Sequence, residues 1–267
     1  MASSPGPGIV PAALVWSDGV ANPDLLPGMT EREDQMPWTR PSRPIRWELV
    51  AKPTGGTRPI AHLDPRDAAV YRRLVQPYAA AVDRGLGAGA FANRTDRFGN
   101  LAAVGPALRR WRRAVDRAMA VPPRGSIIVS DVRDCYGSID PRVLGRVGID
   151  DPDLIGFLRG LEDAGVRGLP VGPPPSAIIA NAVLGLADRA VVEAAAVPIR
   201  WVDDVVLVGR DRLGAEQAFD AWRRALAGLG LDAHDGKTVR EPGLRLARVG
   251  RSPSLAPARS RAIIASP

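Results

Sequence analysis

The segment Trp201-Val-Asp-Asp-Val-Val-Leu-Val208 decides the fold of this chain. Two adjacent aspartates, Asp203 and Asp204, stand between two apolar runs rich in β-branched residues, and this pattern predicts two strands joined by a tight turn. Ionised carboxylates have little reason to occupy such a place unless a cation or a hydrogen-bonded turn holds them. An ordinary hairpin turn is the alternative interpretation, because aspartate is common in turns.

Length, charge and cysteine content limit the class of protein. The chain has 267 residues, 45% of them hydrophobic, which is enough to bury a core in one large domain or two small ones. Its net charge is +7, and 34 of the 36 basic residues are arginine. A basic surface is typical of a protein with a polyanionic partner, although an arginine-rich composition alone gives the same excess charge. The single cysteine, Cys135, excludes an internal disulfide and is compatible with a reducing, cytoplasmic location.

The order of apolar and polar residues favours an α+β fold, in which helices pack on an antiparallel sheet. The expected elements are strands at 46–50 and 126–130, a helix from 67 onward, and helices over 106–119 and 176–196. Ser176 is the expected N-cap of the last helix. The helix at 106–119 carries five arginines outside its apolar positions, which fits either a solvated face or contact with phosphates. No stretch of about 18 apolar residues predicts a membrane span.

A third aspartate has a setting similar to that of the first two. Asp131 follows the apolar segment Ser126–Ser130, so it is expected at the same sheet edge as Asp203 and Asp204 if the two strands are neighbours. Three carboxylates at one edge repel one another unless a divalent cation neutralises them. Hard oxygen ligands suit Mg²⁺, and two such ions can hold the attacking and leaving oxygens of a phosphoryl transfer.

The segment Asp131-Val-Arg-Asp-Cys-Tyr-Gly-Ser-Ile-Asp140 resembles the first catalytic motif of reverse transcriptases, in which an aromatic residue follows the aspartate after five positions. Other segments resemble further motifs of that family, in the family's order. These are the fingers hairpin at 52–59, the segment after it at 64–67, a Leu-Pro-x-Gly loop at 168–176, the aromatic-x-Asp-Asp hairpin at 200–204 and a motif ending in Lys-Thr at 229–238.

This resemblance implies the right-hand architecture of a polymerase, with fingers and a palm whose antiparallel sheet is backed by helices. It divides the chain into an extended arm at 1–45, fingers at 46–125, a palm with the catalytic motifs at 126–240, and a tail or residual thumb at 241–267. Because about 27 residues follow the last motif, the thumb is expected to be minimal or absent. A second protein subunit or a structured non-coding RNA is then expected to supply the missing grip on the duplex.

The resemblance also implies a role for individual residues. Asp131, Asp203 and Asp204 are expected to be catalytic and to bind two Mg²⁺ ions, with the backbone carbonyl of Val132 as a further ligand. Four side chains are expected to bind the incoming nucleotide, namely Lys52, Arg58, Tyr136 and Lys237.

Each of these nucleotide contacts has an alternative. Tyr136 is expected to lie under the sugar and exclude a 2′-hydroxyl, but it could be a core aromatic. Lys52 and Arg58 are expected to bind the triphosphate, but they could belong to a solvated hairpin. Lys237 is expected to neutralise or protonate the leaving pyrophosphate, or else to be an ordinary exposed lysine. Asp134 and Asp140 are expected to be turn or cap residues.

Val171 departs from the family pattern, because many members have a glutamine there that contacts the nucleotide or template. The segment Leu169-Pro-Val-Gly-Pro173 resembles the bacterial antiphage and abortive-infection reverse transcriptases. The expected function is therefore that of an RNA-directed DNA polymerase, which transfers nucleotides from dNTPs to a 3′-hydroxyl on an RNA template. Its expected setting is antiviral defence in the cytoplasm, without membrane association. The alternatives are a polymerase-like nucleic-acid-binding or scaffold subunit, and template-independent or protein-primed DNA synthesis.

Overall fold

A computed structural model describes residues 45–51, 57–120 and 126–240 of the chain. The predicted arm, except for Ile45, the predicted tail at 241–267 and Lys52 lie outside these described residues. Within them, strands and helices are mixed, and all strand pairs within the sheets are antiparallel. The predicted α+β class is therefore confirmed.

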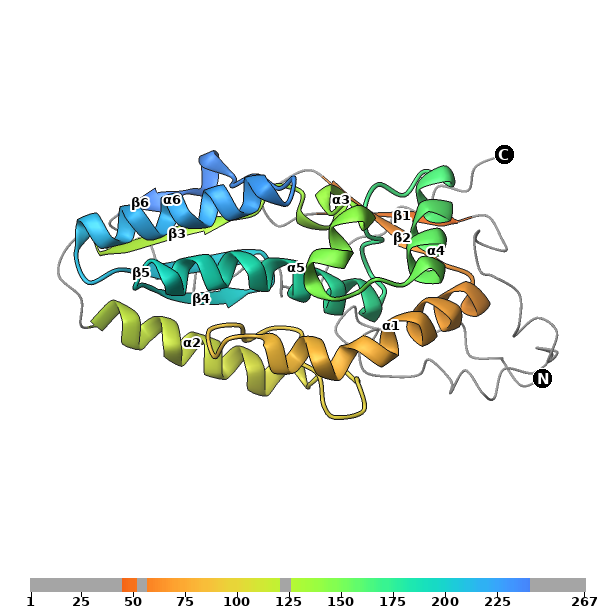
Figure 1. Cartoon of the computed structure of the whole chain (residues 1–267), viewed down its shortest axis with the longest axis horizontal. Coiled ribbons are helices and arrows are strands. Elements are labelled where there is room, and N and C mark those ends of the chain that lie inside the picture. Colours follow the sequence, from red (N-terminus) through yellow and green to blue (C-terminus); the bar gives the residue numbers. More distant parts are fainter. Residues whose placement is uncertain (1–44, 52–56, 121–125, 241–267) are drawn as a thin grey trace, which may run out of the picture.

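A four-stranded antiparallel sheet forms the centre of the molecule, with the strand order β4-β5-β3-β6 (Figure 1). Its strands are β3 (Ile127–Asp131), β4 (Val197–Trp201), β5 (Asp204–Val208) and β6 (Val239–Arg240). Every residue of β3 is buried. This is expected of a strand with helices on both faces, and it explains the continuous apolar run in the sequence.

Helices cover both faces of this sheet. On one face, Ile128, Val205 and Leu207 pack in a core with α5 (Pro174–Glu193) and α6 (Arg212–Gly228). On the other face, α2 (Val104–Ala120) buries Trp111, whose ring centroid lies 5.7 Å from that of Trp201. The predicted palm arrangement, an antiparallel sheet backed by helices, is therefore present.

A second group of elements lies beside the sheet, on the right in Figure 1. It comprises the hairpin of β1 (Arg46–Ala51) and β2 (Thr57–His62), and the helices α1 (Pro65–Gly85) and α4 (Pro152–Asp163). Val70 and Tyr71 of α1 pack in the same core as α5. The elements assigned to fingers and palm thus share buried contacts, and the boundary at 125/126 stays a prediction.

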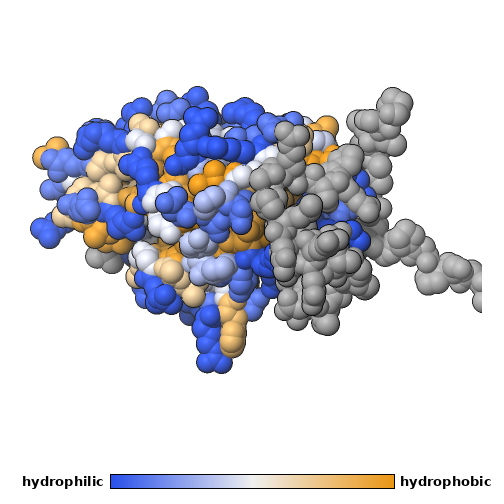
Figure 2. Space-filling view, turned by 45° about the vertical axis from the view of Figure 1, so that its right-hand side comes forward, coloured by the Kyte–Doolittle hydropathy of each residue, from blue (hydrophilic) through white to orange (hydrophobic). Residues whose placement is uncertain are grey.

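Helix α5 is the central core helix. It is long and apolar enough to cross a membrane by length and composition, but 78% of its most apolar window is buried in the protein, as is usual for a core helix. It begins at Pro174, after Pro173, so the prediction that Ser176 caps it is wrong. The Ser176 hydroxyl instead lies inside the helix and shares a hydrogen bond of 3.0 Å with the Tyr71 hydroxyl. The face shown in Figure 2 carries both hydrophilic and hydrophobic side chains, with hydrophobic ones visible near its middle.

Candidate active site

The register of two neighbouring strands brings two of the predicted aspartates together. In the antiparallel pair of β3 and β5, Asp131 is directly opposite Asp204. Asp203 precedes Asp204 in the turn between β4 and β5, and its carbonyl accepts a hydrogen bond of 3.2 Å from the Val132 amide. The hypothesis that both strands deliver their carboxylates to one sheet edge is therefore supported by backbone pairing.

The turn that carries Asp203 has a strained backbone. Val202 has a φ of +55°, a left-handed conformation that β-branched residues rarely adopt. The guanidinium of Arg200 donates a hydrogen bond of 2.9 Å to the Val202 carbonyl and thereby braces the turn. Strain of this kind persists only where the surroundings hold it, and it is frequent at functional sites.

Arg200 is itself fixed by a buried network. It is 1% exposed, its Nε donates to both carboxylate oxygens of Asp188 at 3.0 and 2.8 Å, and its Nη1 donates to Asn181 Oδ1 at 2.8 Å. Both partners are on α5, so the network connects the core helix to the aspartate turn. Sequence reasoning missed these residues, although a charged and an amide side chain inside an otherwise apolar helix were a signal that they pair.

Asp131 is 4% exposed, and its two carboxylate oxygens have different surroundings. Its Oδ2 forms an ion pair with Lys237 Nζ, from η4 (Asp235–Lys237). Its Oδ1 is buried and has no hydrogen-bond partner within the described part of the chain. A buried carboxylate oxygen without a partner is unfavourable, so this atom is suited to a cation ligand. The structure thus places Lys237 against one of the three aspartates, and its contact with a leaving pyrophosphate stays a prediction.

Two of the three carboxylates have raised pKa values. Burial, followed by the charges of Asp203 and Asp131, raises the pKa of Asp204 from 3.8 to about 7. Burial and the charge of Asp131 also raise the pKa of Asp203. The Arg58 guanidinium on β2 opposes both shifts, which brings the predicted triphosphate ligand into electrostatic range of the site. Negative charge therefore accumulates here beyond what the nearby cations offset.

This donor set fits Mg²⁺ in kind, since it offers hard carboxylate oxygens and one buried oxygen without a partner. The described side chains do not form a complete set of metal ligands. Among the described residues, no three acidic, histidine or cysteine side chains are grouped as a metal site. Lys237 takes one of the two oxygens of Asp131. The other oxygen, Oδ1, is the one that has no partner within the described residues.

Tyr136 lies in α3 (Cys135–Ser138), partly buried next to the aspartates. Burial, with a contribution from Asp203, raises its pKa, so the phenol stays protonated at neutral pH. Its carbonyl accepts a hydrogen bond of 2.9 Å from the Leu169 amide. Gly168, with a φ of +60°, permits this approach, because a Cβ there would lie 2.5 Å from the same carbonyl oxygen. The loop at 168–176 is thus packed directly on the segment that carries Tyr136.

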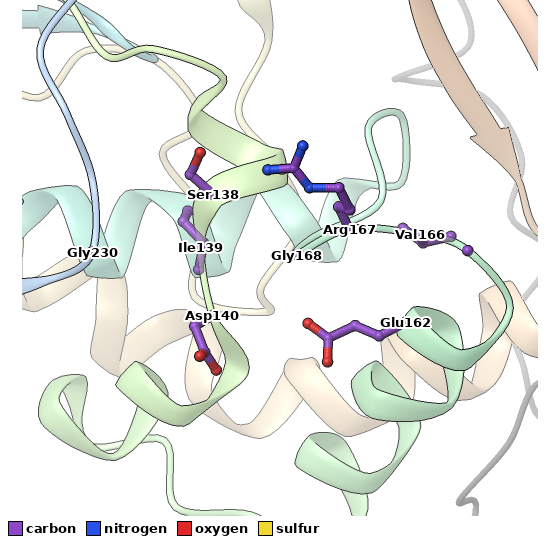
Figure 3. A pocket seen from close by; sticks show the side chains of 10 residues that line it. Ser138, Ile139, Asp140, Glu162, Val166, Arg167, Gly168 and Gly230 are labelled. Carbon is purple, nitrogen blue, oxygen red and sulfur yellow. The ribbon is translucent and has the colours of Figure 1, made fainter.

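Other predicted residues have structural roles or lie elsewhere. Asp140 caps η3 (Pro141–Val147) by accepting a hydrogen bond of 2.8 Å from the Arg142 amide, as expected of a cap residue. Asp134 precedes α3 in a left-handed conformation, with a φ of 42°. A hollow of about 410 Å³ beside α3 has Asp140, Glu162 and Arg167 on its walls (Figure 3), but none of its lining residues is one of the three aspartates.

Comparison with known proteins identifies the fold. No protein-family model and no curated protein matches the sequence. A telomerase from Candida albicans, solved in complex with a TWJ fragment of telomeric RNA, is 12% identical, with a TM-score of 0.50 over 79% of this chain and 44% of the telomerase. The apo telomerase from Candida tropicalis is 14% identical, with a TM-score of 0.50 over 81% and 46%. This chain thus spans less than half the length of either telomerase, and the likeness concerns the fold alone, an α+β polymerase-like fold.

Proposed function

We propose that this chain is an RNA-directed DNA polymerase that transfers nucleotides from dNTPs to a 3′-hydroxyl with the help of two Mg²⁺ ions. The observation that carries this proposal is the direct pairing of Asp131 with Asp204, next to Asp203, on adjacent strands of a polymerase-like fold. Bound Mg²⁺ would polarise the phosphate and neutralise charge that develops during the transfer.

The chain's own residues take distinct roles in this proposal. Asp131, Asp203 and Asp204 hold the ions, together with the carbonyl of Val132. Arg58 and Lys52 bind the triphosphate, and Tyr136 excludes a 2′-hydroxyl from the sugar position. Lys237 would neutralise or protonate the departing pyrophosphate through its ammonium group. The 3′-oxygen forms its bond to the α-phosphorus as the bond to pyrophosphate breaks.

The proposed partners are an RNA template, the DNA product and a structured RNA or second subunit. The RNA of the Candida albicans complex and the basic charge of this chain support a nucleic-acid partner. A role in antiviral defence rests on the sequence of the 169–173 segment alone, and a cytoplasmic location rests on the single cysteine. Loss of protection in a phage plating assay by the Asp203→Ala/Asp204→Ala variant tests that role.

Incorporation of labelled dNTPs tests the activity. The protein is incubated with Mg²⁺ and either a primed RNA or no template, and the wild type is compared with Asp203→Ala/Asp204→Ala. Asp150→Ala/Asp163→Ala is the matched control, because it removes the same charge at exposed positions away from the site. We expect incorporation on primed RNA by the wild type and the control only. Equal signal from all three proteins would refute the proposal, and product without template would identify template-independent synthesis.

One observation favours a second candidate, a nucleic-acid-binding subunit without activity. Lys237 forms an ion pair with Asp131. Among the described residues, no three acidic, histidine or cysteine side chains are close enough together to hold a metal ion. If this arrangement persists in solution, no incorporation occurs with Mg²⁺ or Mn²⁺, while RNA still binds. Lys237→Ala then distinguishes the two cases, since activity that appears only in this variant shows that the ion pair blocks the site.

A further inference from the structure

Helix α2 has one face that the fold does not use. Ala107, Trp111 and Val115 are buried against the sheet, which fixes the rotation of the helix. The opposite face carries five arginines, all exposed, and a single acidic residue, Asp116. The arginines are Arg109, Arg110, Arg112, Arg113 and Arg117.

These charges are not neutralised within the described part of the protein. No ion pair joins any of the five arginines to an acidic side chain there, whereas Arg94, Arg200 and Arg240 each pair with a carboxylate. The one hydrogen bond of the group runs from Arg117 Nε to the Arg113 carbonyl, within the helix. Like charges four residues apart destabilise a helix, so the face lacks an internal reason for its composition.

The arginine-rich composition of the chain does not account for the clustering. Helix α2 has five arginines in 17 residues, whereas α5 has one in 20. Helix α6 has three, offset by Glu216 and Asp220. Helix α1 has four arginines in 21 residues, offset by Asp67 and Asp83. Among the helices that the structure describes, α2 therefore carries the largest net positive charge, +4 (five arginines less Asp116) against +2 for α1 (four arginines less two aspartates).

The spacing of the face suits a phosphate backbone. Arg109, Arg113 and Arg117 form a row in which each arginine is four residues after the one before it, so the row extends about 12 Å along the helix. A nucleic-acid duplex carries one charge per roughly 1.7 Å of axis, and arginine binds phosphate as a planar fork. The row is also rigidly connected to the candidate active site, because Trp111 packs on Trp201, which pairs with Asp204.

We propose that the arginine face of α2 binds the phosphate backbone of a nucleic-acid duplex and holds it at a fixed position relative to the aspartates. This inference rests on the proposed function, because it takes nucleic acid as the partner. It adds which surface of the protein binds the duplex. A duplex of RNA, of DNA or a hybrid presents the same phosphates, so the test includes all three.

The experiment measures binding of labelled 16-base-pair RNA, hybrid and DNA duplexes by fluorescence anisotropy between 50 and 200 mM salt. Arg109→Gln/Arg113→Gln/Arg117→Gln is compared with a matched control, Arg159→Gln/Arg189→Gln/Arg224→Gln, which removes three exposed arginines from α4, α5 and α6. Unchanged unfolding midpoints show that both variants fold.

We expect the α2 variant to bind about tenfold or more weakly at 100 mM salt, with a slope of log K against log salt that is smaller by about two to three. The control should bind like the wild type. A loss confined to RNA and hybrid assigns A-form duplexes, and an equal loss on all three assigns the backbone regardless of form. Equal weakening in the α2 variant and the control, or none in either, overturns the inference. Because binding needs no turnover, failure of the polymerase activity would not affect this result.

Discussion

Val202 occupies the first position of the turn that presents Asp203, with a φ of +55°. A β-branched residue in this conformation costs on the order of 1–3 kcal/mol, and glycine adopts it without that cost. The hydrogen bond from Arg200 to the Val202 carbonyl and the one from Val132 to the Asp203 carbonyl resist relaxation of the turn. The strain is thus stored beside the candidate metal ligands.

Val202→Gly should therefore stabilise the protein by about 1 kcal/mol, since it removes the strain but adds chain entropy to the unfolded state. Urea unfolding followed by tryptophan fluorescence measures the change. Val208→Gly is the control, because Val208 lies in the regular part of β5 and the same substitution should destabilise there by about 1 kcal/mol. A destabilised Val202→Gly variant would mean that the valine side chain contributes more by packing than its backbone costs.

Tyr136 is the residue whose proposed role concerns substrate choice. If its ring excludes the 2′-hydroxyl, Tyr136→Ala should raise the ratio of rNTP to dNTP incorporation by about tenfold or more, as expected when a steric clash is removed. Tyr136→Phe should keep the wild-type ratio, because the ring remains. Competition between labelled dNTP and rNTP measures this ratio, and an unchanged ratio in the alanine variant would make Tyr136 a core aromatic.

Asp204 gives the protein a pH-dependent stability. Its pKa is raised to about 7 in the fold, so the folded state binds the proton more tightly than the unfolded chain does. This contribution is present below the unfolded pKa of about 3.9 and is lost as pH rises toward 7. Without metal, Asp204→Asn should therefore be more stable than the wild type at pH 8, by up to about 4 kcal/mol, and similar to it near pH 4.

Unfolding midpoints at pH 4 and pH 8, with chelator or with Mg²⁺, measure this dependence. Bound metal should raise the midpoint of the wild type at pH 8 but not that of Asp204→Asn, because the cation replaces the proton as the compensating charge. If the two proteins have equal midpoints at pH 8 in chelator, the carboxylate is not destabilised in the fold.

At the scale of elements, the contact between β4 and α5 depends on the buried pair of Arg200 and Asp188. Removal of one partner leaves a buried charge, so Asp188→Asn should cost about 3 kcal/mol or more, whereas Arg200→Met/Asp188→Leu should recover much of that stability. The double variant should not recover polymerase activity, because the Val202 turn still lacks its brace. Calorimetry measures the stability and dNTP incorporation measures the activity of the same samples. If the double variant recovers both, the ion pair of Arg200 and Asp188 has only a structural role.

The same elements show what the sequence can and cannot predict. The strands around Asp131 and Asp204 and the helices α2 and α5 follow from apolar periodicity, which is local. The partners of Arg200 and Asp131 do not, because Asp188 is 12 residues away from Arg200 and Lys237 is 106 residues away from Asp131. Such pairs exist only after β4 packs on α5 and after η4 folds back onto β3. The strain at Val202 was hidden for the same reason, because valine in a strand-rich segment predicts an extended backbone.

At the scale of the whole molecule, the predicted fingers and palm are joined through one core. Tyr71 of α1, Cys135 of α3 and Trp222 of α6 belong to the same buried cluster. Elements that share a core generally unfold together, since neither retains enough buried apolar surface alone. The segments 46–125 and 126–240 are therefore expected to behave as one cooperative unit.

The single cysteine tests this cooperativity. Cys135 is 3% exposed, and burial raises the pKa of its thiol well above its usual value, so alkylation requires the protein to open. Labelling in native buffer should be at least about 10³-fold slower than in urea. Its rate should also rise with urea in parallel with the unfolding reported by tryptophan fluorescence, because opening of α3 then requires loss of the shared core. Cys135→Ser controls for labelling elsewhere. Fast labelling that is independent of urea would show instead that α3 opens locally, and that Tyr136 and Asp131 move apart from the rest of the fold.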